Sequence, residues 1–436
     1  MSFHKQTVRD IDLKNKTVII RVDFNVPLDE HGIITDDYRI RQALPTIEHV
    51  RGMGAKIVLL SHLGRPTGPG DVKNSLMACA TRLSDLLHLP VKFAPDCIGQ
   101  AASSMVAAMQ PGDIVLLENL RFYSEEEAND EAFAKKLASL GDVFVQDGFG
   151  VVHRAHASTD AITRFLPSVA GFLLEREVDT ITNAMENPKR PLAVVIGGAK
   201  VSDKIELLEL FIEKADYVAV VGAMANTFLL AQGVAVGSSL VEPDALDTAK
   251  RILDKAEART KKERFTFYLP HDVVVAKGID ETAPTRVVDI ALHTWADISN
   301  YPKQPPRHSY TVASDEWILD IGPMTAASIA GALKLACTAI WNGTAGVTET
   351  KGFHGAADPY AHGTKIIAEA LTGEHAGDKN VPFTVVGGGD TVGFVESVSS
   401  LRERLGHVST GGGASLELMA GKKLPGVEAL LSSDKK

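Results

Sequence analysis

Residues 192–214 read LAVVIGGAKVSDKIELLELFIEK, a sequence in which a strand, a turn and a helix follow one another. Leu192–Ile196 is a continuous apolar run, Gly197 and Gly198 interrupt it, and Asp203–Lys214 places apolar residues at helical spacing. A strand that is apolar at every position is typical of a parallel sheet with helices on both faces. This sequence therefore indicates one strand–helix unit of an α/β fold.

The same pattern recurs in both directions along the chain. Further short apolar runs are found at Thr17–Val22, Lys56–Leu60, Asp113–Leu117, Asp142–Val145, Tyr217–Val221, Thr338–Trp341 and Phe383–Val386. Asp244–Arg259 is another segment with helical spacing. Strands that alternate with helices in this way predict an α/β protein with doubly wound parallel sheets.

The length of 436 residues exceeds what one compact core accommodates, so two or three domains are expected. The clearest boundary lies near residues 167–191, where the helical stretch Leu173–Glu186 leads into a segment with Pro188 and Pro191. A long helix that ends in a proline-rich break is a suitable connector between two lobes of similar size. The proline-rich segment 297–314 is expected to be a surface excursion.

The composition narrows the class of protein. With 45 Lys and Arg against 55 Asp and Glu, the net charge is −10, which argues against a nucleic-acid partner. No run approaches the ~18 apolar residues of a membrane span, and the first residues lack the pattern of a signal peptide. Cys79, Cys97 and Cys337 lie far apart, which favours reduced thiols over disulfides or zinc. We expect a cytoplasmic protein without a membrane partner.

Polar and basic side chains follow the strands of the first lobe. Because ligands of doubly wound sheets bind at the carboxyl ends of the strands, these side chains are expected to meet at one edge. Arginine pairs with both phosphate and carboxylate, so the set favours a small ligand that carries both groups. A single arginine would more simply be a surface ion-pair partner. The residues are Asp23, Asn25, His62, Arg65, Arg121 and Arg154, with Arg39 at the start of the first crossover helix.

Two other patterns in this lobe have plainer interpretations. His62, His153 and His156 invite a metal site, but no carboxylate or thiolate set accompanies them, so structural or substrate-binding histidines are favoured. The acidic run Glu125–Glu127 is expected to be the solvated first turn of a helix, where negative charge favours the helix dipole.

Glycine follows the strands of the second lobe. The segments are Gly197–Lys204, Gly222–Asn226, Gly387–Thr391 and Gly411–Gly413. Glycine lets a backbone approach a ligand, and the start of a helix offers free N–H groups to phosphate. Each segment alone would be a tight turn, but four together favour a nucleotide site. Lys200 and Lys204 would share a helix face if the helix starts early, and Asp390 is a candidate magnesium ligand.

Two common nucleotide motifs are absent from the chain. GxxxxGK[ST] does not occur, and GxGxxG does not follow the first strand, which weakens a P-loop ATPase and a dinucleotide dehydrogenase.

These residues together resemble the phosphoglycerate kinase family from about Lys14 to Leu430. The motifs that carry the resemblance are residues 21–27, 61–66, 118–122, 153–158, 197–204, 341–343, 387–391 and 409–415. The resemblance implies two Rossmann-like lobes joined by a hinge helix. It assigns residues 1–172 to a phosphoglycerate-binding lobe, 173–190 to the hinge, 191–406 to a nucleotide-binding lobe, and 407–436 to a segment that returns to the first lobe.

The resemblance also implies roles for individual residues. 3-Phosphoglycerate would be bound by Asp23, Asn25, Arg39, His62, Arg65, Arg121 and Arg154. ATP or ADP would be bound by Lys200, Lys204, Gly222, Asn342, Glu349, Gly387, Gly388, Gly389, Asp390 and Thr391, with Mg²⁺ on Asp390. The catalytic groups would be Arg39, Lys200, Lys204 and the backbone of Gly412 and Gly413. The family implies a monomer that acts on small molecules.

The chain departs from the family pattern on the nucleotide side. Thr344, Ala345 and Thr348 replace other residues in the segment after Trp341–Gly343, and Ile318 stands where glycine is common. An alternative to an active kinase is therefore a homologue that binds phosphoglycerate but has lost nucleotide turnover. A dehydrogenase on a similar scaffold is the third hypothesis, and it would have to bind NAD.

Overall fold

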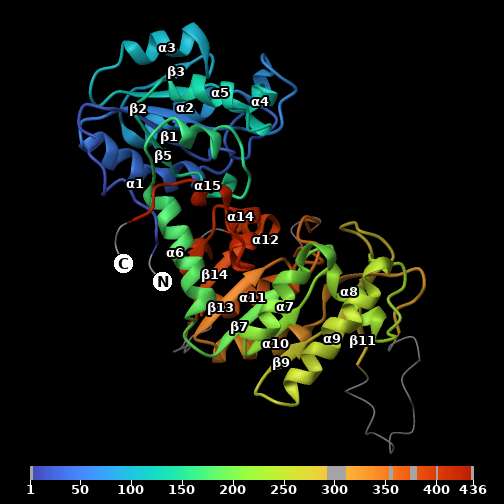
Figure 1. Cartoon of the computed structure of the whole chain (residues 1–436). Coiled ribbons are helices and arrows are strands. Elements are labelled where there is room, and N and C mark those ends of the chain that lie inside the picture. Colours follow the sequence, from blue (N-terminus) through green and yellow to red (C-terminus); the bar gives the residue numbers. More distant parts are fainter. Residues whose placement is uncertain (1–2, 292–310, 353–356, 374–380, 399–400, 434–436) are drawn as a thin grey trace, which may run out of the picture. The chain divides into compact units, whose positions relative to one another are not determined.

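The computed structural model describes residues 3–291, 311–352, 357–373, 381–398 and 401–433 (Figure 1). The chain divides into two compact units. The first unit comprises Met1–Thr182 and Thr410–Lys436, and the second comprises Asn183–Ser409. The division falls within helix α6 (Phe172–Glu186), which begins one residue before the predicted connecting helix.

The first unit contains a six-stranded parallel sheet in the order β3-β4-β2-β1-β5-β6. Its strands are β1 (Thr17–Arg21), β2 (Lys56–Leu60), β3 (Val91–Ala94), β4 (Ile114–Leu117), β5 (Val143–Gln146) and β6 (Ser168–Ala170). Its α-helices are α1 (Tyr38–Gly52), α2 (Met77–Leu87), α3 (Gly99–Ala107), α4 (Ser124–Glu127), α5 (Glu131–Ala138), α14 (Gly412–Met419) and α15 (Pro425–Glu428).

Both faces of this sheet are buried. Val18 and Ile20 of β1 pack into one hydrophobic core, and Ile19 between them packs into a second core on the other face. Because side chains alternate along a strand, a strand covered on both sides must be apolar throughout. The doubly wound arrangement predicted from the sequence is therefore confirmed.

The two ends of the chain meet in the first unit. The N–H of Gln6 donates to the carbonyl of Leu431 at 2.8 Å, and the N–H of Ser433 donates to the carbonyl of His4 at 2.8 Å. Thr7 also forms a parallel bridge with Ala170 beside β6. The described residues near both ends of the chain, residues 4–7 and 431–433, therefore close one edge of this unit together.

The second unit contains another six-stranded parallel sheet, in the order β15-β14-β13-β7-β8-β9. Its strands are β7 (Leu192–Ile196), β8 (Tyr217–Val220), β9 (Thr266–Tyr268), β13 (Thr338–Asn342), β14 (Phe383–Gly387) and β15 (His407–Val408). Its helices are α7 (Ile205–Lys214), α8 (Ala223–Ala231), α9 (Leu246–Thr260), α10 (Pro323–Leu335), α11 (His362–Thr372), α12 (Gly389–Ser397) and α13 (Leu401–Arg404). The predicted fold class, two doubly wound α/β lobes, is confirmed.

A small antiparallel sheet in the second unit was not predicted. It pairs β10 (Asp272–Ala276) with β11 (Arg286–Asp289) on one side and β12 (Trp317–Ile321) on the other. Val273, Val275 and Val288 form its own small core. The proline-rich segment 297–314 lies outside the described residues up to position 310.

The start of α7 corrects one expectation. The helix begins at Ile205, after a single 3₁₀ turn at Ser202–Lys204, and Lys200 lies in the irregular loop before that turn. Lys200 and Lys204 therefore do not share a helix face. Among the described residues, no helix combines the length and apolar character that crossing a bilayer requires.

Candidate functional site

The first unit contains a polar cavity of about 640 Å³ at the carboxyl ends of its strands. All seven residues predicted to bind phosphoglycerate line it, and so do Gly412 and Gly413 at the start of α14. His153, considered above as a structural or substrate-binding histidine, also lines the cavity, together with five residues that were not predicted, which are Gly64, Pro66, Glu127, Gly150 and Val151. The prediction that these side chains meet at one edge of the sheet is confirmed.

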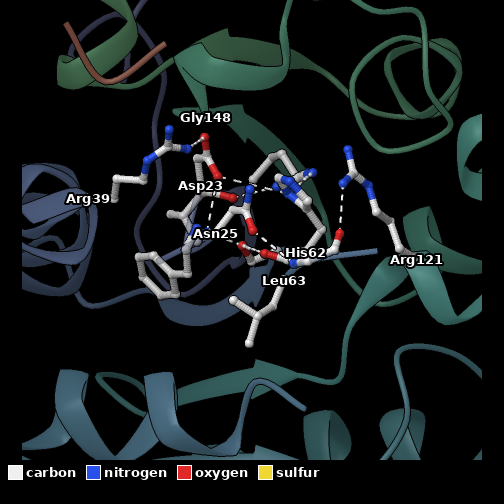
Figure 2. Close-up of polar contacts among 12 residues, drawn as sticks. Asp23, Asn25, Arg39, His62, Leu63, Arg121 and Gly148 are labelled. Carbon is white, nitrogen blue, oxygen red and sulfur yellow. Dashed lines mark hydrogen bonds and ion pairs between the residues drawn. The ribbon is translucent and has the colours of Figure 1, made fainter. Parts of the chain in front are cut away.

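Asp23 and Arg39 form an ion pair on one side of this cavity (Figure 2). Asp23 follows β1 and is buried, while Arg39 lies in the first turn of α1 and remains partly exposed. Gly150 makes room for the pair, because a Cβ atom there would lie 2.2 Å from Asp23 Oδ2 and 3.4 Å from Arg39 Nη1. The carboxylate thus holds the guanidinium in place at the cavity wall.

Asn25 and Arg121 hold the loop after β2 from two sides. The Asn25 side-chain oxygen accepts from the N–H of Gly64 at 2.8 Å, and Arg121 Nη1 donates to the Gly64 carbonyl at 2.9 Å. Gly64 has φ +62°, and a Cβ atom there would lie 2.0 Å from Asn74 Oδ1. Only glycine fits this position, so the loop that carries Arg65 has a defined path.

His62 lies between Arg39 and Arg121 and contacts a buried arginine (Figure 2). Arg21 Nη2 lies 3.3 Å from His62 Nδ1, whereas Asp23 Oδ1 lies 3.9 Å away. A guanidinium only donates hydrogen bonds, so Nδ1 must accept and the ring proton must sit on Nε2. Burial, together with the charges of Arg21 and neighbouring arginines, holds the pKa of His62 well below its usual range. His62 is therefore a neutral donor rather than a cation.

Beneath His62, Arg21 is balanced by Glu126, which corrects another expectation. Glu126 was expected to be solvated, but it is 1% exposed and accepts from the Ser158 N–H at 3.0 Å and the Ser158 hydroxyl at 2.5 Å. Arg21 Nε donates to the same hydroxyl at 2.8 Å, and Glu126 Oε1 lies 4.0 Å from Arg21. Burial raises the pKa of Glu126, while Arg21 and Ser158 oppose that rise. The one sequence signal for this pair is a charged residue at the end of an apolar strand.

The start of α14 packs against His153. A Cβ atom at Gly413 would lie 2.9 Å from His153 Nε2, so the helix approaches this closely only with glycine there. Arg154 Nε lies 3.2 Å from the same nitrogen. Burial lowers the pKa of His153, and the charge of Arg154 lowers it further. The free backbone N–H groups at the start of α14 thus face a cavity rich in positive charge.

The second unit contains a smaller cavity, of about 150 Å³, beside the glycine segments. Gly222, Glu349 and Asp390 of the predicted nucleotide residues line it. The cavity is also lined by three residues that depart from the family pattern, Ile318, Thr344 and Ala345. The fourth such residue, Thr348, is buried but does not line the cavity. A third cavity, of about 720 Å³ beside α9, contains none of the predicted residues.

Lys204 is held by neighbouring polar groups. Its Nζ donates to the Asn342 side-chain oxygen at 2.6 Å and also to the carbonyl of Gly197. Burial lowers the pKa of Lys204 to about 8, although Asp390 and Asp203 act in the opposite direction. A partly desolvated lysine of this kind gains much from an anionic ligand.

Asn342 connects Lys204 to the triple-glycine segment. It is fully buried at the end of β13, and its Nδ2 has no hydrogen-bond partner among the described residues. A Cβ atom at Gly388, which has φ +92°, would lie 3.1 Å from that nitrogen. Nearby, Thr391 Oγ1 accepts from the Gly343 N–H at 2.6 Å. An unpartnered buried donor is costly unless a ligand accepts from it.

Several of the remaining residues predicted to bind the nucleotide are more exposed than Lys204 and Asn342. Gly387 ends β14, and Gly389 and Asp390 are exposed at the start of α12. Lys200 is exposed in the loop after β7, and the structure does not bring it into the wall of the cavity. The roles assigned to all these residues stay predictions.

The comparisons with known proteins all indicate the same protein family. The family model for phosphoglycerate kinase matches residues 8–422. Phosphoglycerate kinase of Pelotomaculum thermopropionicum is 46% identical over 428 residues, 98% of this chain and 99% of that protein. Phosphoglycerate kinase of Chloroflexus aggregans is 45% identical over 434 residues, which are 99% of this chain and 100% of that protein. The solved structures of phosphoglycerate kinase from Coxiella burnetii (TM-score 0.78, 36% identical) and Pyrococcus horikoshii (TM-score 0.79, 30% identical) each cover 98% of both chains.

Proposed function

The chain belongs to the phosphoglycerate kinase family, and on this premise we propose that it transfers a phosphoryl group between MgATP and 3-phosphoglycerate. The products are MgADP and 1,3-bisphosphoglycerate, and the reaction is reversible. The chain is thus a phosphotransferase with a carboxyl group as acceptor. The observation that carries the proposal is the single cavity that gathers Arg39, Arg65, Arg121 and Arg154 around a neutral His62.

The acceptor chemistry is consistent with this cavity. A carboxylate is already ionised at neutral pH, so the attacking oxygen needs no general base. His62 is neutral, with its proton on Nε2, and can donate a hydrogen bond to a substrate oxygen without exchanging a proton. The arginines neutralise the phosphate and carboxylate of the substrate. The side chains of this unit therefore bind and orient the acceptor.

On the donor side, the second unit supplies positive charge and backbone donors. Lys204 and Lys200 would neutralise the phosphates, and the start of α12 would offer N–H groups to them. Asn342 Nδ2 would gain the acceptor that it lacks. Catalysis then consists of alignment of the two anions and stabilisation of the charge on the moving group.

Asp390 fits the role of a magnesium ligand. The described residues contain no group of three or more His, Cys, Asp or Glu that could hold a metal. A single exposed carboxylate at a phosphate site is what Mg²⁺ commonly uses in nucleotide complexes, where phosphates and water complete the shell. When bound, the ion would neutralise charge on the nucleotide phosphates.

The wider setting follows from the family. We propose that the enzyme acts in glycolysis and gluconeogenesis, as a cytoplasmic monomer without a nucleic-acid partner. With one substrate on each unit, bending at the connecting helix would be required for transfer, and closure would also exclude water. The assignment of residues 1–172, 173–190, 191–406 and 407–436 to these roles is part of the proposal.

A coupled assay tests the proposal. 3-Phosphoglycerate and MgATP are supplied, and a dehydrogenase that consumes the acyl phosphate oxidises NADH. We expect turnover that Lys200→Ala abolishes. Folded protein that binds 3-phosphoglycerate but shows no turnover would instead indicate the nucleotide-impaired homologue, which no observation favours at present.

A further inference from the structure

The loop that carries Lys200 and Lys204 is tied to a carboxylate from elsewhere in the second unit. Glu242 accepts hydrogen bonds from the backbone N–H groups of Val201 and Ser202, the latter at 3.1 Å. Its other oxygen accepts from the Ser202 hydroxyl at 2.6 Å. All three contacts fall between the two lysines in the sequence.

Glu242 is itself anchored to α8. Its N–H donates to the Thr227 hydroxyl at 3.1 Å, and Thr227 is 1% exposed. Two residues earlier, the carbonyl of Leu240 accepts from Asn226 Nδ2 at 3.2 Å. The carboxylate is therefore presented from a segment that is fixed on a buried helix, not from a loose loop.

The 3₁₀ turn Ser202–Lys204, which precedes α7, needs such a partner at its start. The first N–H groups of a helix lack intrahelical acceptors, and Val201, which precedes the 3₁₀ turn, has no polar side chain to cap them. Glu242 supplies both the acceptor and a favourable negative charge. Partial burial raises the pKa of Glu242, but the hydrogen bonds from Ser202 and Val201 and the charge of Lys200 outweigh it and leave the pKa lowered. The group is ionised at neutral pH.

We propose that Glu242 is a positioning residue for phosphoryl transfer, which fixes the loop 197–204 so that both lysines are presented to the nucleotide. This inference rests on the proposed function. Glu242 would touch neither substrate, and its effect would pass through the loop. It would also attract Lys200 until the phosphates of the nucleotide compete for that charge.

Steady-state kinetics test the proposal with Glu242→Ala, Glu242→Gln and a control, Glu209→Gln. The control removes an exposed ion pair between Glu209 of α7 and Arg251 of α9. For Glu242→Ala we expect kcat/KM for MgATP to fall about 10- to 100-fold, as misplaced catalytic groups typically cause. KM for 3-phosphoglycerate should change less than about twofold, because that site lies in the other unit. Glu242→Gln keeps an acceptor and should recover part of the loss, and Glu209→Gln should match the wild type.

A double variant separates positioning from a general structural role. If Glu242 acts through the lysine loop, Glu242→Ala should weaken MgADP binding little beyond the loss of affinity that Lys200→Ala already causes, because the two effects share one route. Fully additive losses, or equal rises in KM for both substrates, would overturn the proposal.

Hydrogen exchange gives a readout that does not depend on the reaction. In Glu242→Ala, amide exchange should accelerate in peptides that cover residues 197–207 and stay unchanged in the first unit. Unchanged exchange at this loop would also overturn the proposal. If exchange accelerates but the wild type does not phosphorylate 3-phosphoglycerate, the proposed function is wrong. In that case Glu242 still holds the loop 197–204 in place.

Discussion

The two candidate sites are built by opposite means. In the first unit, side chains bond to one another around the cavity, as Asp23 does with Arg39 and Asn25 with the loop at Gly64. In the second unit, Gly198, Gly222 and Gly346 line part of a small cavity, Asp390 is exposed in its wall, and Lys200 is exposed in a loop outside that wall. The first site is therefore assembled before its ligand arrives, and the second depends on the ligand to complete it.

The largest expected effect is that of Arg39→Ala in the assembled site. It removes a guanidinium that Asp23 holds at the cavity, so we expect turnover to fall by about a thousandfold or more. The coupled assay measures this loss. Arg41→Ala is a matched control, because Arg41 lies on the same helix in an exposed ion pair with Asp37. Near-normal turnover of Arg39→Ala would contradict both the assignment and the contrast between the units.

Gly150→Ala tests whether close packing fixes the first site. The added Cβ would lie 2.2 Å from Asp23 Oδ2, so the ion pair with Arg39 must shift. We expect KM for 3-phosphoglycerate to rise about tenfold or more while KM for MgATP stays the same. Gly52→Ala is the control, since a Cβ at Gly52 would have no atom within 4 Å. Equal changes in both KM values would show that the substitution does not act on the first site alone.

Lys204 allows a test of whether the ligand completes the second site. Its pKa is lowered to about 8 by burial, and an anionic nucleotide should raise it again. Nucleotide binding at pH 8 should therefore take up about half a proton. Calorimetry of MgADP binding in two buffers of different ionisation enthalpy measures the uptake. Lys204→Arg, which stays charged, should abolish it, and an equal uptake in that variant would rule out Lys204 as the source.

The same lysine predicts a stability change with pH. Because the folded pKa of Lys204 lies below its unfolded value, the unfolded chain binds more protons between about pH 8 and pH 10.5. The contribution of Lys204 to the free energy of unfolding should therefore increase as the pH rises through this window. Chemical denaturation of the wild type and of Lys204→Met at several pH values checks it. An identical pH dependence in the two proteins would contradict the prediction.

The smallest expected effect is the absence of a titration at His62. Its ring should stay neutral through the pH range in which an ordinary histidine titrates, because it is buried and faces Arg21, Arg39, Arg121 and His156, which lower its pKa. Long-range ¹H–¹⁵N NMR should report a proton on Nε2 and none on Nδ1 throughout. A midpoint between pH 6 and 7, or a proton on Nδ1, would mean that the contact between His62 and Arg21 is not formed in the free protein.

Most of the first site could be predicted because strand ends are visible in the sequence. Asp23, His62 and Arg121 each follow an apolar run, and parallel strands bring such positions to one edge. Glu126 could not be predicted, since it stands among three consecutive glutamates and only the folded chain determines which one points inward. For the same reason the partner of Arg21 was missed.

The fold was predictable where strands alternate with helices and less so elsewhere. The antiparallel sheet was missed because β10, β11 and β12 do not repeat the strand–helix unit. The start of α7 was placed too early because Ser202–Lys204 has helical spacing but forms a 3₁₀ turn held by Glu242. Both errors arise from contacts between distant segments, which local spacing does not contain.

The meeting of the two chain ends has a consequence during synthesis. His4 and Gln6 are made before the second unit, whereas their partners Ser433 and Leu431 are made after it. The 227 residues of Asn183–Ser409 are translated in between, which takes roughly 10 to 45 s at about 5–20 residues per second. The first unit is thus begun before the second unit and completed after it, and its open edge has to wait on the ribosome for residues that follow Ser409.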